Sequence, residues 1–156
     1  MTTIGTTDTT APARPAPSPH RGRTRSLVVA GTVGAALGSW LVAVPLLRVD
    51  LAVQPAGAGT QTVSWTVGVV AVFATSLIAA LLGWALLAVL EHWTTRARTI
   101  WTAVAAVVLL LSLAGPLTSA LTTPAAVALV ALHLVVGSVL ILGLRQTSAR
   151  AGTAAA

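Results

Sequence analysis

The chain has 156 residues, of which 56% are hydrophobic and only 8% are charged, and its mean hydropathy is +0.91. Soluble domains carry about 25% charged residues, so this composition excludes both a water-soluble globule and a wholly disordered chain. A hydrocarbon core of about 30 Å takes about 20 apolar residues per helical span, and a chain of this length has room for four spans.

Residues 1–25 are predicted to form a disordered tail, because they are rich in threonine and proline and hold nothing that could build a core. The tail ends in Arg21, Arg23 and Arg25. A cleaved signal peptide is the rival interpretation, but the apolar run that follows is too long for one. We expect the three arginines to bind the anionic surface of the inner membrane leaflet.

Four apolar segments follow the tail, at residues 26–47, 63–90, 99–121 and 124–144. The second segment is longer than a bilayer requires, which predicts a tilted or protruding helix. The link between the last two is so short that they must form an antiparallel hairpin, with Thr123 as the N-cap and Pro124 at the first helical position. The sequence therefore predicts an all-α fold, an antiparallel four-helix transmembrane bundle, followed by a short tail at residues 145–156.

The arginines predict the orientation of this bundle. The chain has no lysine, and eight of its nine arginines lie in the two tails or between the second and third segments, whereas Arg48 lies on the other side. This bias predicts a multi-pass protein of the cell membrane with both termini in the cytoplasm. Trp93 and Trp101 are then expected at the inner interface and Trp65 at the outer one.

The formal net charge of +6 raises the question of nucleic-acid binding. The arginines sit at the ends of apolar segments rather than on a folded basic domain, so we expect no nucleic-acid partner. Glu91 ends the second segment beside His92, Arg96 and Arg98, and we interpret this group as a solvated charge cluster at the inner interface.

The segment after the first span alternates apolar and polar residues with a period of two, which predicts an extended strand with one apolar face on the bundle or the membrane surface. Arg48 and Asp50 would point the same way along it and could form an ion pair. We interpret this segment as a structural lid, with a binding surface as the alternative.

Small residues predict how the helices pack, because close approach matters more than hydrophobicity between helices in lipid. The first span carries a stripe of Gly31, Gly34 and Gly38, and the fourth has Gly137 on the same face as His133. We expect these glycines to face other helices of the same chain. A homodimer through Gly34 and Gly38 is the alternative.

Pro116 lies inside the third segment, where it removes one backbone hydrogen bond and clashes with the carbonyl four residues before it. A kink is therefore expected near residues 112–115. Helix shape is the simpler reason for this proline, and a carbonyl offered to a ligand is the alternative.

His133 is the only ionisable residue well inside a predicted span. Ser39, Ser76 and Ser112 lie within roughly one helical turn of its depth, one on each of the other spans. Such a layer is either a structural network of hydrogen bonds or a small polar cavity that serves a proton or a solute. The structural interpretation is favoured, since serines in membrane helices often bind their own backbone.

Other chemistry is scarce. The chain has no cysteine, no cluster of metal-ligating residues, no pair of axial ligands for a haem and no nucleophile motif. We therefore expect no catalytic, cofactor-binding or metal-binding residue and no enzyme activity.

Four motifs together resemble a known family: the loop Arg48-Val-Asp-Leu-Ala-Val-Gln54, the helix end Gly83-Trp-Ala-Leu-Leu-Ala-Val-Leu-Glu91, Leu111-Ser-Leu-Ala-Gly-Pro116 and Leu132-His-Leu-Val-Val-Gly137. The chain resembles a family of uncharacterised small four-span membrane proteins from high-GC bacteria over residues 26–144. The resemblance implies the fold and the compartment and carries no activity.

These observations predict a non-enzymatic structural or accessory membrane protein, with a homo-oligomer or another membrane protein as partner. The alternative is a small transporter or proton-linked sensor that uses His133 and the serine layer.

Overall fold

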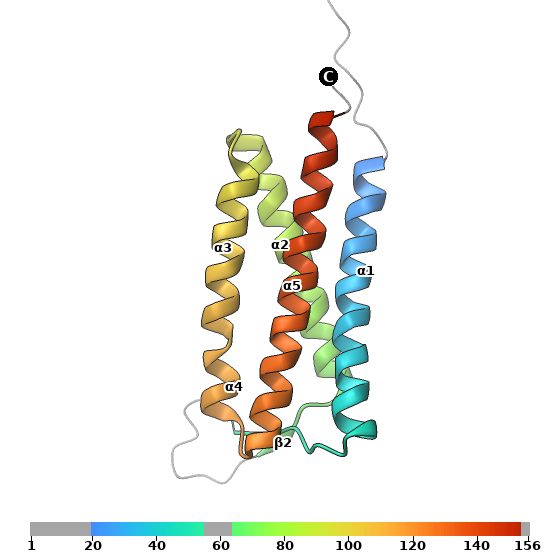
Figure 1. Ribbon diagram of the computed structural model, residues 1–156, viewed down its shortest axis with the longest axis vertical. Helices are drawn as coiled ribbons and strands as arrows, with labels where there is room; N and C mark the ends of the chain where they lie inside the picture. Colours follow the sequence, from blue (N-terminus) through green and yellow to red (C-terminus); the bar gives the residue numbers. More distant parts are fainter. Residues whose placement is uncertain (1–19, 55–63, 154–156) are drawn as a thin grey trace, which may run out of the picture.

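The structure is a computed structural model that describes residues 20–54 and 64–153, with side chains at residues 22–54 and 64–146. In these residues four long helices run side by side, each antiparallel to the one before it (Figure 1). They are α1 (His20–Leu41), α2 (Val69–Trp93), α3 (Ala97–Ser112) and α5 (Thr123–Thr153). The predicted antiparallel four-helix bundle is confirmed.

Four helical stretches are long and apolar enough to cross a membrane: Gly22–Leu46, Val69–Trp93, Ala97–Ser119 and Thr123–Gln146. The first includes one turn of π-helix, η1 (Val42–Leu46), which contains Pro45, and the third includes the short helix α4 (Ala114–Ser119). The chain is therefore a multi-pass membrane protein.

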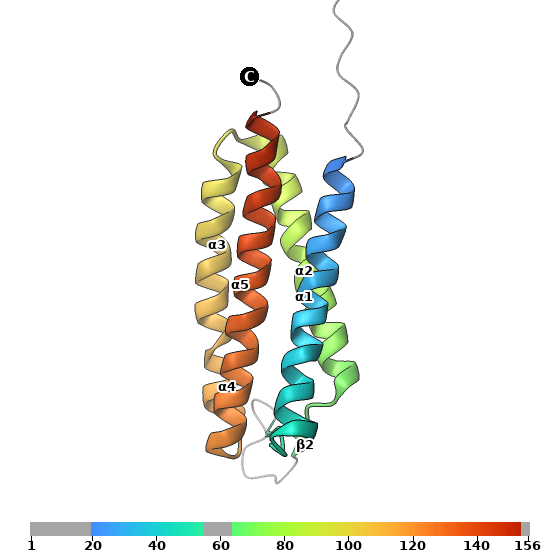
Figure 2. The same ribbon diagram turned by 45° about the vertical axis from the view of Figure 1, so that its right-hand side comes forward.

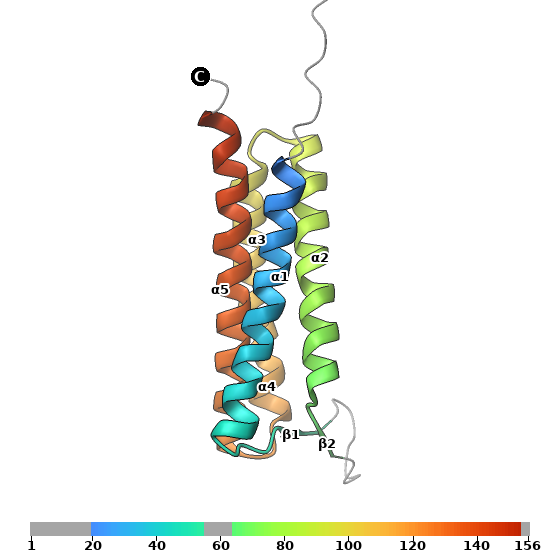
Figure 3. The ribbon, with the colours of Figure 1, turned by 90° about the vertical axis from the view of Figure 1, so that its right-hand side faces the viewer.

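The helices occupy the four corners of the bundle. Helix α1 packs against α2 and α5, and α3 packs against the same two helices, so α1 and α3 lie at opposite corners (Figures 1 and 3). We call the end that holds the start of α1 and the end of α5 the terminal end; the α2–α3 turn lies there too (Figure 2). The opposite end is the loop end.

A small cap of extended backbone closes the loop end. Strand β1 (Ala52–Val53) pairs antiparallel with β2 (Trp65–Thr66), and Val53 also forms a bridge with Ala120 after α4. The amide of Leu121 donates to the carbonyl of Ala52 at 3.1 Å. Backbone hydrogen bonds thus join the connection after α1 to the connection before α5.

Apolar side chains of this cap face the bundle. Leu51 and Val53 are buried in one cluster with Ala125 and Leu129 of α5, and the indole of Trp40 packs against it. The prediction of an extended segment with one apolar face on the bundle is confirmed for Leu51 and Val53, whereas Leu47, which was expected on the same face, is 64% exposed. The alternation of apolar and polar residues predicts the inward face of Leu51 and Val53 because successive side chains of a strand point to opposite faces.

The predicted ion pair between Arg48 and Asp50 is wrong. Both residues are exposed, and the ion pair found among the described residues lies elsewhere. Arg48 has a φ of 55°, so its backbone is in the left-handed region rather than extended. The two side chains therefore do not share one face of a strand.

Several predicted boundaries also need correction. Helix α1 begins at His20, so the predicted tail is helical over its last six residues, while residues 1–19 lie outside the described part. Helix α2 begins at Val69 rather than at residue 63, because Trp65 and Thr66 pair with β1. Helix α5 continues to Thr153, well past the predicted end at residue 144.

The hairpin of the last two spans is present, but its cap is shifted by one residue. The amide of Ala125 donates to the hydroxyl of Thr122 at 3.3 Å, so Thr122 and not Thr123 occupies the N-cap position of α5. The expected distortion before Pro116 is confirmed. Helix α3 ends at Ser112, α4 begins at Ala114, and the amide of Leu113 between them donates to the carbonyl of Leu110.

Candidate functional site

The four residues of the predicted polar layer each bind their own helix. The hydroxyls of Ser39, Ser76 and Ser112 donate to the carbonyls three or four residues before them, at 2.8, 3.0 and 2.7 Å. In the described part of the chain, no hydrogen bond joins these serines to one another or to His133. The geometry is that of serines satisfied by the backbone.

His133 is half-buried on α5, and its Nδ1 lies 2.7 Å from the carbonyl oxygen of Leu129. A carbonyl can only accept, so Nδ1 carries the hydrogen of this bond. The bond fixes the ring against its own helix, and Nε2 takes no part in it.

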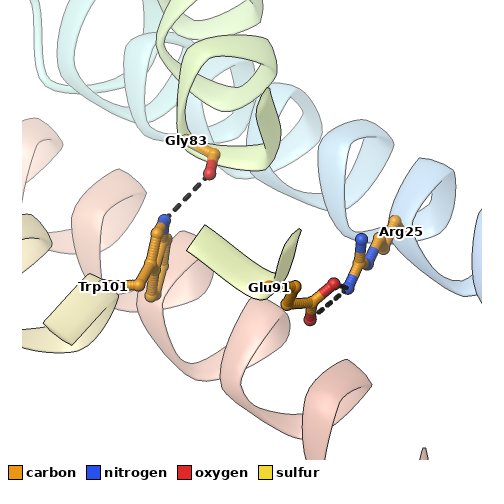
Figure 4. A network of polar contacts seen from close by, with 4 residues as sticks. All are labelled: Arg25, Gly83, Glu91 and Trp101. Carbon is orange, nitrogen blue, oxygen red and sulfur yellow. Dashed lines mark hydrogen bonds and ion pairs between the residues drawn. The ribbon is translucent and has the colours of Figure 1, made fainter. Parts of the chain in front are cut away.

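An ion pair joins α1 and α2 at the terminal end. Nη2 of Arg25 donates to Oε1 and Oε2 of Glu91 at 2.6 and 2.7 Å (Figure 4). The side chain of Arg25 is only 9% exposed and that of Glu91 is 27% exposed, so Glu91 forms the open side of the pair. We call this contact the terminal clasp.

The terminal clasp does not use the guanidinium fully. One nitrogen serves both carboxylate oxygens, whereas the strongest arginine–carboxylate pairs use two nitrogens side by side. Nε of Arg25 is buried and has no hydrogen-bond partner among the described residues. A buried donor without an acceptor costs about 1–3 kcal/mol.

Trp101 ties α3 to α2 close to the terminal clasp. Its Nε1 donates to the carbonyl of Gly83 at 2.8 Å, and its ring is 1% exposed in a cluster with Leu87 and Leu144 (Figure 4). Trp101 therefore does not face the lipid headgroups, as a residue of the expected aromatic belt would. Trp93 and Trp65 are 80% and 63% exposed, as interface residues would be.

Trp40 is the counterpart of Trp101 at the loop end. Its Nε1 donates to the carbonyl of Val67 at 2.9 Å, just before α2 begins. The amide of Val67 in turn donates to the carbonyl of Leu51 at 3.0 Å. The indole of Trp40 thus fastens the cap to α1.

The glycines divide into two groups. A Cβ added at Gly137 would lie 2.6 Å from Leu109 of α3, and one added at Gly143 would lie 2.6 Å from Val28 of α1. Gly137 therefore packs inside the bundle as expected.

Gly31, Gly34 and Gly38 are exposed, and an added Cβ at each meets nothing within 4 Å. The expectation that they pack against helices of the same chain is wrong, because α1 turns its Val29, Val33 and Ala36 side inward instead.

The terminal clasp and the two indole bonds were not found from the sequence. Glu91 is the only acid next to the predicted cytoplasmic end of a span, and Arg25 is the last arginine before the first span. Antiparallel neighbours bring the start of one helix beside the end of the next, so these two facts together could have identified the pair. No sequence signal marks which carbonyl an indole reaches.

Metal chemistry finds no support in this arrangement. Within the described ranges, no three residues of His, Cys, Asp or Glu come together as a metal site would require.

Comparisons with known proteins give the chain a family but no function. A model of a family of unknown function, DUF6069, matches residues 16–150, which is most of the chain. The chain belongs to this family. No curated protein and no solved structure matches it. The family match covers all four candidate membrane spans and both of the indole bonds, and it assigns none of them a role.

Proposed function

We propose that this member of the family is a non-enzymatic structural or accessory membrane protein that acts through contacts of its helices with lipid and with other helices. The fate of the polar side chains carries the proposal. The serines and His133 bind their own helices, and Arg25, Trp40 and Trp101 bind neighbouring elements. These polar side chains thus form hydrogen bonds within the chain and stabilise its fold.

The orientation belongs to the same proposal. We place both termini in the cytoplasm of a bacterial cell, with the terminal end at the inner leaflet of the cell membrane. Arg23 is exposed there and can contact anionic lipid. The side chain of Arg21 is not among those that the structure describes. Arg25 faces Glu91, so its contact with lipid would require the terminal clasp to open.

The exposed side of α1 is the proposed place for helix contacts. Gly31, Gly34 and Gly38 leave the backbone open over about two turns, and close approach of small residues is what joins helices in lipid. A second copy of this chain or another membrane protein would fit this side.

A photo-crosslinking amino acid at residue 34 tests the proposal in native membranes. The matched control is position 108, because Val108 is 57% exposed on α3 and should face lipid. The proposal expects protein adducts from position 34 and only lipid adducts from position 108.

Lipid adducts alone at both positions would overturn the contact role. A proton or solute flux in vesicles that His133→Gln abolishes would overturn the structural interpretation and favour a transporter. The exposure of the α1 glycines makes substitution at residue 34 compatible with folding.

A further inference from the structure

The guanidinium of Arg25 is the least satisfied polar group that the structure describes inside the bundle. Its side chain is more than nine-tenths buried, Nε has no acceptor among the described residues, and Nη2 donates to both oxygens of Glu91. A guanidinium has a planar fork of donors that matches two oxygens of one oxyanion. The terminal clasp leaves half of this fork empty.

The surroundings favour an oxyanion that would compete with Glu91. Arg23, Arg96, Arg98 and Arg145 are exposed around the terminal end. Among the described residues, Glu91 is the one acid at this end. An excess of positive charge beside a membrane raises the local density of anionic headgroups. The abundant oxyanion at this depth is the phosphate of a phospholipid.

We propose that Arg25 is a binding site for the phosphate of an anionic phospholipid, reached by exchange with Glu91. In the exchanged state Nε and Nη2 hold two phosphate oxygens side by side, and Glu91 turns to water through its exposed side. The terminal clasp is then a lipid-responsive contact between α1 and α2. This inference rests on the proposed lipid contact of the terminal end and names the residue that makes it.

A lipid headgroup can reach Arg25 from the side on which Glu91 is exposed to solvent. Glu91 is three times as exposed as Arg25, so headgroups meet the carboxylate first and displace it outward. Arg25 lies less than two turns from the start of α1, and rotation about its own side-chain bonds brings the guanidinium to the surface. The helix α1 need not leave the bundle, because Val29 and Val33 remain packed.

The test follows the Nε–H signal of Arg25 by NMR in lipid nanodiscs, with Arg25→Lys to assign it. Phosphatidylglycerol is raised stepwise in phosphatidylcholine, whose phosphate is already balanced by its own choline. A saturating shift of the Arg25 signal is expected. In Glu91→Gln the midpoint should fall to a mole fraction of phosphatidylglycerol roughly three- to tenfold lower, since the competing charge is gone.

Two controls make the result specific. Asp50→Asn removes an acid at the loop end and should leave the midpoint unchanged. Inorganic phosphate added to phosphatidylcholine nanodiscs should produce no shift, and a shift there would overturn the assignment to lipid in favour of a free anion. Glu91→Asp serves as a second variant if Glu91→Gln fails to fold: its shorter side chain keeps the charge but weakens the ion pair, so its midpoint should also lie below that of the wild type.

An Arg25 signal that does not change with phosphatidylglycerol would overturn the proposal, as would equal midpoints in the wild type and Glu91→Gln. Neither result bears on crosslinking at residue 34, which lies more than two turns away on α1. Failure of the lipid site and failure of the proposed helix contacts are therefore distinguishable.

Discussion

At the terminal end, α1 and α2 are joined by two charged side chains, whereas at the loop end the elements are joined by backbone. Arg25 and Glu91 meet at 2.6 Å, while the cap uses the β1–β2 pairing and the bond from Leu121 to Ala52. Backbone bonds survive most substitutions, but an ion pair depends on two particular residues and on the charges around them. The loop end is therefore built to stay closed, and the terminal end is the one that can respond to its surroundings.

An indole bond to a backbone carbonyl supports each end, and burial makes the two unequal. Trp101 is 1% exposed in the core of the terminal end, whereas Trp40 is half-buried beside the cap. The comparison predicts that the terminal end depends on a few side chains whose loss is costly. Substitutions at the two ends test this difference.

The largest effect is expected from Trp101→Ala. Truncation of a fully buried tryptophan costs about 3–5 kcal/mol, because apolar contacts are lost and a cavity remains between Leu87 and Leu144. The free energy of unfolding in detergent micelles, followed by circular dichroism, measures the loss. Trp40→Ala is the matched control at the loop end and should cost clearly less. Equal losses would contradict the contrast between the two ends.

Glu91→Gln should come next, with a loss of about 1–3 kcal/mol in the free energy of unfolding. The substitution leaves the buried charge of Arg25 without its counter-ion, and the partial exposure of Glu91 limits the cost. Asp50→Asn provides the comparison at the loop end. Asp50 is exposed and lies in no ion pair of the described chain, so its change should stay within about 0.5 kcal/mol. Indistinguishable variants would show that the terminal clasp does not stabilise the bundle.

Gly143→Ala tests the α1–α5 contact, with an expected loss of about 1–2 kcal/mol. The new Cβ would lie 2.6 Å from a methyl of Val28, a stiff side chain that can move little. Gly34→Ala is the control on the exposed side of α1, where the added methyl meets nothing within 4 Å. It should be neutral or stabilising by about 0.5–1 kcal/mol through helix propensity. Thermal unfolding of the two variants in the same detergent would show whether stability falls in Gly143→Ala and stays equal or rises in Gly34→Ala.

How much of this could be predicted from the sequence depends on the kind of interaction. The four spans follow from the length of the apolar runs, and the inward apolar face of Leu51 and Val53 follows from the alternation of apolar and polar residues. The distortion before Pro116 follows from the chemistry of one residue. These features need no knowledge of which helices are neighbours.

The orientation of each helix about its own axis could not be predicted in the same way. Gly31, Gly34 and Gly38 form a regular stripe, yet α1 packs with Val29, Val33 and Ala36 instead. In lipid both faces of such a helix are apolar, so hydrophobicity does not decide which one turns inward. The start of α2 was misplaced for a related reason, since Trp65 and Thr66 suit a strand as well as a span.

The smallest effect is expected from Trp40→Phe, which removes one hydrogen bond and keeps most of the apolar ring. The carbonyl of Val67 loses the indole donor, so the free energy of unfolding should fall by only about 0.5–1.5 kcal/mol. Because the cap is held by backbone bonds, the change should stay local. Hydrogen exchange should accelerate at the amide of Val67, which donates to Leu51, and not at amides of α2 near Gly83.

Trp101→Phe is the matched substitution at the terminal end, and it removes the bond to Gly83 while keeping a buried ring. Its exchange pattern should spread through the neighbouring turns of α2 and α3, because side chains rather than a backbone ladder hold this end. Acceleration confined to one or two amides in both variants would mean that the two ends are equally rigid. Such a result would remove the physical basis for an exchange of Arg25 between Glu91 and lipid, since that exchange needs a terminal end that yields more easily than the loop end.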